Sequence, residues 1–312
     1  DLRMSRGLGD VYKRQVQGNG CATLNITPQR LSGAYARLVW ETGTQANSVI
    51  SSLGYDGSRI RFRTGTQQGN ALIGLFNAGG ECVWSWHIWV ANYDPESSAQ
   101  KYSSGDIFMD RNLGTVGTDY TKVTACGLYY QWGRKDPFPH PASFTNNARP
   151  ASFIYHDNYA YGTIRPEDHD AREVMSVKWA TQHPTTFIRK ADYEVDEPEE
   201  DVLDWLFRSH HNLWGNTTEQ GYDVSKVCRK TIYDPCPPGW RVPDACDFEG
   251  IAMSQTQLPY CVNIVYSGTK TARYPAGGTF DGDSYSGAGT YGQVYTLSLI
   301  HISEPTRHAQ IS

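Results

Sequence analysis

The stretch Asp234-Pro-Cys-Pro-Pro-Gly-Trp-Arg-Val-Pro243 places four prolines, one glycine, one cysteine and one tryptophan in ten positions. Proline fixes φ and lacks a backbone N–H, so neither a helix nor a central strand tolerates this density. We therefore expect a rigid, irregular loop that uses Trp240 as a large apolar anchor. Asp244, which follows directly, is a suitable N-cap for a helix through Cys246 and Phe248. The stretch predicts an architectural element, not a catalytic motif.

The two ends of the sequence are related to each other through the genetic code. Each residue of 297–307 has a codon whose complement encodes the opposing residue of 5–15, in reverse order. Two peptides that encode complementary strands form an inverted DNA repeat, and this one looks like translated sequencing adapter. We therefore leave residues 1–15 and 297–312 out of the fold argument as adapter-derived.

Charge and composition limit the class of partner. The sequence carries 28 Lys and Arg against 33 Asp and Glu, for a formal net charge of −5. Because neutralisation of phosphates requires clustered basic residues, this balance argues against a nucleic-acid partner. No apolar run approaches the roughly 20 residues of a membrane span. The 30 Gly, 20 Tyr and 9 Trp are typical of a loop-rich, β-rich extracellular protein.

Cysteine and histidine spacing predicts no metal site and no cofactor. The seven cysteines form neither a CxxC pair nor a zinc-ligand pattern. They are Cys21, Cys82, Cys126, Cys228, Cys236, Cys246 and Cys261. Buried free thiols and one or two disulfides of an exported protein remain equally good interpretations. The histidines between residues 140 and 183 also lack the HxxxH and HExxH spacings of helical metal sites.

Residues 16–95 predict a small β-sandwich or sheet. Strands are expected at 36–41, 58–63, 70–76 and 82–90, where apolar and polar residues alternate or form short apolar runs. In the second of these segments, Arg59, Arg61 and Arg63 alternate with apolar residues. The turn-forming sequence Asn77-Ala-Gly-Gly80 joins the last two strands as a hairpin.

The strand 82–90 contains three tryptophans with two competing interpretations. Trp84, Trp86 and Trp89 could form an aromatic platform on which a sugar ring stacks, and they are the candidate ligand-binding residues. Alternatively, they belong to the core of the sandwich or to a contact between domains, which is the more common role of such a strand. His87 on the same strand is expected to be structural.

Two further segments follow the polar boundary near residue 95. Asp106-Ile-Phe-Met-Asp-Arg-Asn-Leu113 predicts a strand that ends in a charged cluster. Gly127-Leu-Tyr-Tyr-Gln-Trp-Gly133 has apolar residues at i and i+4, which predicts a short helix that ends at Gly133. Residues 134–139 are expected to form a turn.

Near the other end of the natural sequence we expect one helix and one turn. The acidic segment Glu197 to Phe207, with proline in its first turn, predicts a helix. Asp281-Gly-Asp-Ser-Tyr285 predicts a turn, because it lacks the spacing and the terminal Glu of a calcium-binding EF-hand loop.

Residues 105–296 resemble the FISUMP family, the Fibrobacter succinogenes major paralogous domain. Four segments carry the resemblance in the family's order, namely residues 106–113, 127–134, 230–243 and 274–278. The motif residues are Asp110, Arg111, Asn112, Trp132, Cys236, Gly239, Trp240 and Pro243. The preceding block, residues 69–93, looks like the segment that precedes this domain in fimbrillin-like exported proteins of gut Bacteroidetes.

The resemblance implies a fold and a location. It implies an α+β protein in which the β-rich domain of residues 16–95 precedes a C-type-lectin-like domain at 105–296. That second domain would be incomplete, because adapter stands where a closing aromatic-serine strand and a Cys-containing strand are expected. Cys236 would then be left from a lost disulfide. The resemblance also implies a secreted or outer-membrane-anchored lipoprotein, with any lipid anchor upstream of this sequence.

Three functions from different classes are compatible with these observations. A non-enzymatic surface binding or adhesion module that contacts a glycan or a surface protein is the main expectation. A structural pilus or fimbrial component is the first alternative. The second is an oxidoreductase of the formylglycine-generating type, because Gly239 to Pro243 is similar to a segment of that group. Its copper or iron chemistry needs paired reactive cysteines or a histidine cluster, so we predict no catalytic residue.

Overall fold

The computed structural model describes residues 31–102, 105–145, 150–189, 205–207, 213–216, 229–243, 245–248, 253–255, 261–266 and 270–292. Both ends of the chain, residues 1–30 and 293–312, and most of the helix expected at 197–207 lie outside these residues. Within them, the chain forms several small sheets and a few short helices, a mostly β or α+β fold. No helix in this part of the chain is both long and apolar enough to cross a membrane.

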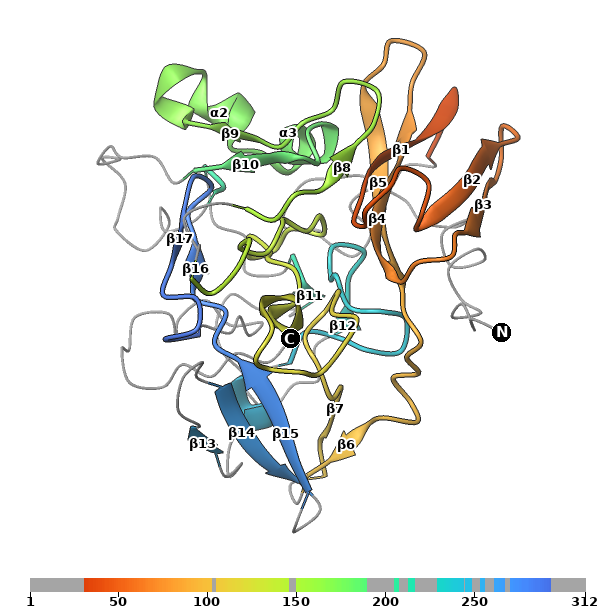
Figure 1. Ribbon diagram of the computed structural model, residues 1–312. Helices are drawn as coiled ribbons and strands as arrows, with labels where there is room; N and C mark the ends of the chain where they lie inside the picture. Colours follow the sequence, from red (N-terminus) through yellow and green to blue (C-terminus); the bar gives the residue numbers. More distant parts are fainter. Residues whose placement is uncertain are drawn as a thin grey trace.

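The largest sheet is antiparallel and has the strand order β5-β4-β1-β8. It consists of β1 (Tyr35–Glu41), β4 (Gly69–Phe76), β5 (Cys82–Val90) and β8 (Ile154–Tyr155) (Figure 1). The first three strands confirm the sequence prediction, and so does the hairpin turn, in which Gly80 N–H donates to Asn77 O at 3.1 Å. The fourth strand comes from beyond residue 95, so the sheet includes both of the expected domains.

A second hairpin, β2 (Ile50–Tyr55) and β3 (Ile60–Thr64), packs beside this sheet. Its inward residues Leu53, Ile60 and Phe62 contact a cluster of buried residues from β1, β4 and β5. The buried Glu41 carboxylate fixes the start of the hairpin by accepting the Val49 and Ile50 N–H groups at 2.9 and 3.2 Å. The apolar face of the hairpin therefore packs against the core.

The main hydrophobic cluster crosses the expected domain boundary. Trp84 of β5 packs in one cluster with Met109, Trp132, Trp214 and Val242. The four residues that pack with Trp84 come from four separate segments, all of them beyond residue 95. The β-rich region and the motif-bearing region therefore share a core around β5.

The other elements are short. They are β6 (Gln100–Lys101), β7 (Ile107–Phe108), η3 (Val123–Cys126), β9 (Gly162–Ile164), η4 (Pro166–Asp168), α2 (Ala171–Val174), α3 (Val177–Gln182), β10 (Thr186–Ile188), β11 (Gly215–Asn216), β12 (Arg229–Lys230), η5 (Ala245–Phe248), β13 (Met253–Gln255), β14 (Cys261–Tyr266), β15 (Lys270–Pro275), β16 (Thr279–Phe280) and β17 (Tyr285–Ser286). β13, β14 and β15 form a separate antiparallel sheet at the bottom of Figure 1, with the β6–β7 pair beside it.

Three predicted elements differ from the structure. Residues 127–133 form no helix, because Gly127 has a φ of 76° and Tyr129 instead pairs across an isolated bridge with Phe138. Long-range pairing thus overrides the local i,i+4 pattern. Of the strand expected at 106–113, only β7 is present. The helix expected after Asp244 begins as the 3-10 turn η5, and residues 249–252 lie outside the described part.

Candidate functional site

A groove of about 510 Å³ lies between two of the motif segments. One wall is formed by residues 106–109, which include β7. The opposite wall is formed by the proline-rich loop, through Cys236, Gly239, Trp240, Arg241 and Pro243, with Asp247 of η5 beside it. The volume falls in the range of small-molecule and side-chain binding sites. The structure thus brings four of the eight predicted motif residues to the lining of one groove, where Gly239 is exposed, Trp240 is half-buried, and Cys236 and Pro243 are buried.

The conformation of the proline-rich loop follows from its sequence. Trp240 N–H donates to Pro237 O at 3.0 Å, and Gly239 has a φ of 87°. Proline at the second position and glycine with positive φ at the third are the requirements of a type II turn. The buried Asp234 carboxylate then joins both ends of the loop by accepting the N–H groups of Cys236 at 2.8 Å and Val242 at 2.9 Å. The loop is therefore preorganised.

The wall formed by residues 106–109 is held in place by contacts with buried aromatic residues. Tyr274 of β15 donates its hydroxyl to Met109 O at 2.6 Å, and burial raises the pKa of this hydroxyl well above its ordinary value. The Phe108 ring packs on Phe248 of η5, with ring centroids 5.2 Å apart. This aromatic contact connects the two walls, so the width of the groove is set by buried packing.

The open side of the groove combines apolar and charged groups. Ile107 has 55% of its surface exposed, which is unusual for a large aliphatic residue in the described chain. Trp240 is half-buried, and it packs its inner face on the main core. The Arg241 guanidinium pairs with the Asp247 carboxylate at 3.0 Å. Sequence reasoning identified Trp240 but not the roles of its neighbours Arg241 and Asp247, and it missed Ile107, which reaches the site only through long-range folding.

The remaining motif residues hold other parts of the fold together. Asp110 binds Arg111 through two contacts at 2.8 and 3.0 Å, and the Arg111 guanidinium lies 3.9 Å from the centre of the Tyr93 ring. Asn112 donates its side-chain amide to Cys126 O at 3.0 Å. Trp132 is buried and accepts a hydrogen bond on its carbonyl from the Trp205 indole. These four motif residues are structural.

Of the two interpretations of the β5 tryptophans, the structure favours the core role over the aromatic platform. Trp84 has 1% of its surface exposed, so its ring is not available to a ligand. Trp86 and Trp89 are half-buried and pack on the same cluster, and the Trp89 indole donates to Thr115 O at 3.1 Å. This burial has a physical reason, because segments from beyond residue 95 cover the face that a lone hairpin would expose.

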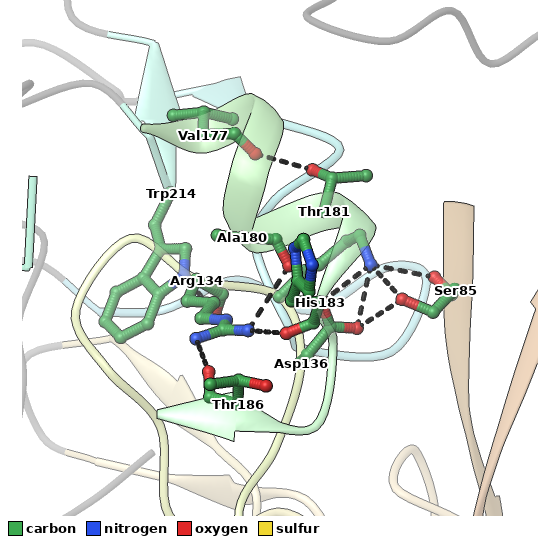
Figure 2. A network of polar contacts seen from close by, with 10 residues as sticks. Ser85, Arg134, Asp136, Val177, Ala180, Thr181, His183, Thr186 and Trp214 are labelled. Carbon is green, nitrogen blue, oxygen red and sulfur yellow. Dashed lines mark hydrogen bonds and ion pairs between the residues drawn. The ribbon is translucent and has the colours of Figure 1, made fainter. Parts of the chain in front are cut away.

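A buried polar network covers the outer edge of β5. Lys135 Nζ lies 2.7 and 2.9 Å from the two Asp136 oxygens and donates to Ser85 O at 3.2 Å. Ser85 Oγ donates to Asp136 Oδ1 at 2.6 Å, and Figure 2 shows these two side chains facing each other. Lys135 Nζ also lies 4.5 Å above the centre of the Trp84 ring. The Lys135 ammonium thus provides a hydrogen-bond donor for the carbonyl of Ser85, a buried residue of the edge strand β5.

Arg134, beside this pair, fixes the end of helix α3. Its guanidinium donates to Ala180 O at 3.2 Å and His183 O at 2.7 Å, and also to Thr186 O at 2.7 Å (Figure 2). A cation at a helix C-terminus satisfies carbonyls that have no helical partner and complements the helix dipole. Burial lowers the pKa of Arg134 to about 10, against the opposing effect of Asp136, so the group is charged at neutral pH. The sequence prediction of a simple turn missed this role.

His87 is structural, as expected, and it is held neutral. Asn70 donates its amide to Gly114 O at 2.7 Å, which leaves Asn70 Oδ1 as the acceptor 3.0 Å from His87 Nε2. Nε2 therefore carries the proton. Burial lowers the pKa of His87 to about 3.

Between the ordinary pKa of histidine and pH 3, the unfolded chain binds a proton at His87 that the folded chain does not. The free energy of unfolding therefore falls as the pH drops through this window, by up to about 1.4 kcal/mol per pH unit from this group. We expect His87→Gln to flatten that acid slope and the exposed-residue control His169→Gln to keep it, in urea unfolding at several pH values. An NMR titration of His87 near its ordinary pKa would contradict this assignment.

Two of the buried cysteines are expected to be poor nucleophiles. Cys82 and Cys126 are buried free thiols, and burial raises the pKa of each to about 12. A thiol that stays protonated at neutral pH is a poor nucleophile and a poor metal ligand. Cys21 and Cys228 lie outside the described residues.

The acidic turn near the C-terminal end is a turn, as predicted. The Asp281 carboxylate accepts the backbone N–H groups of Asp283 and Ser284 at 2.9 and 2.8 Å. Asp283 in turn forms ion pairs with Arg189 and Arg165. In the part of the chain that the structure describes, no three His, Cys, Asp or Glu side chains converge as a metal site.

Comparisons with known proteins add no information on function to the geometry of the groove. The chain matches no protein-family model, no curated protein and no solved structure.

Proposed function

We propose that this chain is a non-enzymatic binding module of a bacterial exported surface protein, and that it binds its ligand in the groove between residues 106–109 and the loop 236–243. The proposal includes membership of the FISUMP family and a C-type-lectin-like fold for residues 105–296. It also includes an extracellular or outer-membrane location. A glycan or a surface protein is the expected ligand.

One observation carries the proposal. Two of the four segments that resemble the family meet at one open groove, although they are far apart in sequence. The Asp234 hydrogen bonds and the contact between Phe108 and Phe248 hold the two walls, while Ile107 is exposed and Trp240 is half-buried. Exposed apolar groups on a rigid frame are typical of binding surfaces, because ordering them costs little when a ligand arrives.

The side chains of the groove suit a ligand that has both apolar and polar surface. The Trp240 ring and Ile107 offer apolar contact, while Arg241 and Asp247 offer donors and acceptors at the rim. A sugar ring has apolar C–H faces and a polar edge, and it matches this arrangement. A protein side chain of mixed character does so as well.

The test is binding of the labelled full chain to arrays of glycans and surface proteins, followed by affinity measurement for each hit. Truncation of a central aromatic contact costs about 2 kcal/mol, so we expect Trp240→Ala to weaken binding roughly 30-fold. Tyr291→Ala, which also removes a partly exposed aromatic ring but outside the groove, is the matched control.

A second pair of variants separates binding from folding, since Trp240 also packs on the core. Ile107→Asn removes an exposed groove residue, and Val116→Asn removes an exposed apolar residue elsewhere. We expect only the first to lose binding, with unchanged circular dichroism in both. Full retention of binding by Ile107→Asn and Trp240→Ala would place the ligand elsewhere.

A further inference from the structure

The outer face of strand β3 carries a row of arginines. Arg61 and Arg63 are exposed, Arg59 is exposed just before the strand, and the intervening Ile60 and Phe62 point into the core. Alternate residues of a strand point the same way and lie about 6.6–6.8 Å apart. The Cα atoms of the three arginines therefore span roughly 13 Å along one face. Figure 1 shows the β2–β3 hairpin at the outer margin of the molecule.

The neighbouring strand leaves this row uncovered. Gly54 lies opposite Arg61 and Ser52 lies opposite Arg63, and both are exposed and uncharged. Asp56 pairs with Arg61 at 2.9 Å. In the described part of the chain, neither Arg59 nor Arg63 has an acidic partner, so the row keeps a local positive charge although the whole chain is acidic.

The backbone that presents the row is fixed. Ser51 Oγ donates to Thr64 O at 3.0 Å and to Arg63 O at 3.3 Å, beside a register shift between Ile50 and Ser52. At the other end, the Asp56 carboxylate accepts the N–H groups of Ser58 and Arg59 at 3.0 and 2.8 Å. These contacts lower the pKa of Asp56 to about 2, with the Ser58 N–H bond as the largest cause. Asp56 therefore stays ionised.

We propose that Arg59, Arg61 and Arg63 bind a linear anionic polysaccharide laid along β3. The planar guanidinium matches the paired oxygens of carboxylate and sulfate groups. Repeated acidic groups along an extended chain fit a straight row of cations, and the small Ser52 and Gly54 leave room beside it. This surface is separate from the groove, so its test is independent of the function proposed there.

Nucleic acid fits the row less well. Proteins that bind duplexes through phosphates typically neutralise 6–10 of them, about two to three times what this row provides. Single-strand binders add aromatic platforms for the bases. On this hairpin Phe62 lies on the inward face, in contact with the core, and Tyr55 shares that face because it pairs with the inward residue Ile60.

The test measures binding of the full chain to immobilised heparin, which carries sulfates, and to polygalacturonate, which carries only carboxylates. DNA is the third probe. The triple variant Arg59→Gln, Arg61→Gln, Arg63→Gln is compared with Lys101→Gln, Lys122→Gln, Lys178→Gln, which removes the same charge from scattered exposed positions. We expect the arginine variant to lose roughly tenfold or more in affinity, and the slope of log affinity against log salt to fall by about 2–3.

A gain of affinity provides a second readout. Asp56→Asn removes the acid beside Arg61 but keeps an oxygen acceptor for the turn, so binding should strengthen roughly two- to fivefold. The sulfated and carboxylated probes identify which anion is preferred. Equal losses in the arginine and lysine variants, absence of binding to both polysaccharides, or tighter binding to DNA would overturn the proposal.

Discussion

Replacement of Asp136 with alanine is expected to lower the free energy of unfolding by about 3–5 kcal/mol. The substitution leaves the Lys135 ammonium inside the core without its carboxylate, and Ser85 loses its acceptor. The side chains of Lys135 and Asp136 are 8% and 2% exposed, so water does not replace the lost contacts. Urea unfolding followed by tryptophan fluorescence measures the change.

Two comparisons make this result specific. Asp119→Ala breaks an exposed pair with Lys122 at 3.6 Å and should cost less than about 1 kcal/mol. The double variant Lys135→Met with Asp136→Leu removes both charges and should recover much of the stability, because two apolar groups leave no buried ion unpaired. A loss below about 1 kcal/mol for Asp136→Ala would mean that the pair is solvated.

Replacement of Trp84 with alanine is expected to cost about 3–5 kcal/mol. The ring is buried, packs against Tyr233 with centroids 5.6 Å apart, and lies under Lys135. Its removal leaves a cavity where the two regions of the chain meet. Thermal and urea unfolding should both show the loss.

This variant also distinguishes the core role of β5 from a ligand platform. Trp84→Phe keeps most of the apolar volume and should lose less stability while ligand binding is unchanged. Trp179→Ala, at a half-buried tryptophan stacked on His183, serves as the control and should cost less than Trp84→Ala. Loss of ligand binding by Trp84→Phe at unchanged stability would restore the platform interpretation.

The sequence predicted those elements whose determinants are local. Alternation and short apolar runs located β1, β4 and β5, and the Asn77 to Gly80 turn joined the last two. The proline-rich loop was predicted as rigid, and its type II turn follows from the residues it contains. In these cases the preferences of neighbouring residues agree with the final structure.

Long-range contacts determined the rest. The segment 127–133 has a helical i,i+4 pattern, yet Leu128 N–H donates to Leu113 O and Tyr129 pairs with Phe138, which keeps it extended. Arg134, Lys135 and Asp136 look like a charged surface turn, and only the fold shows that they are buried. The groove likewise depends on which distant segments meet, and local sequence patterns do not reveal that pairing.

The most direct test of the account is array binding by Ile107→Asn compared with Val116→Asn, because both substitute exposed apolar residues, with 55% and 41% of their surface accessible, and only Ile107 lines the groove. The account predicts at least one glycan or surface-protein hit for the wild-type chain that Val116→Asn keeps and Ile107→Asn loses. No hit for the folded wild-type chain, or equal binding by both variants, would contradict a ligand-binding role for the groove.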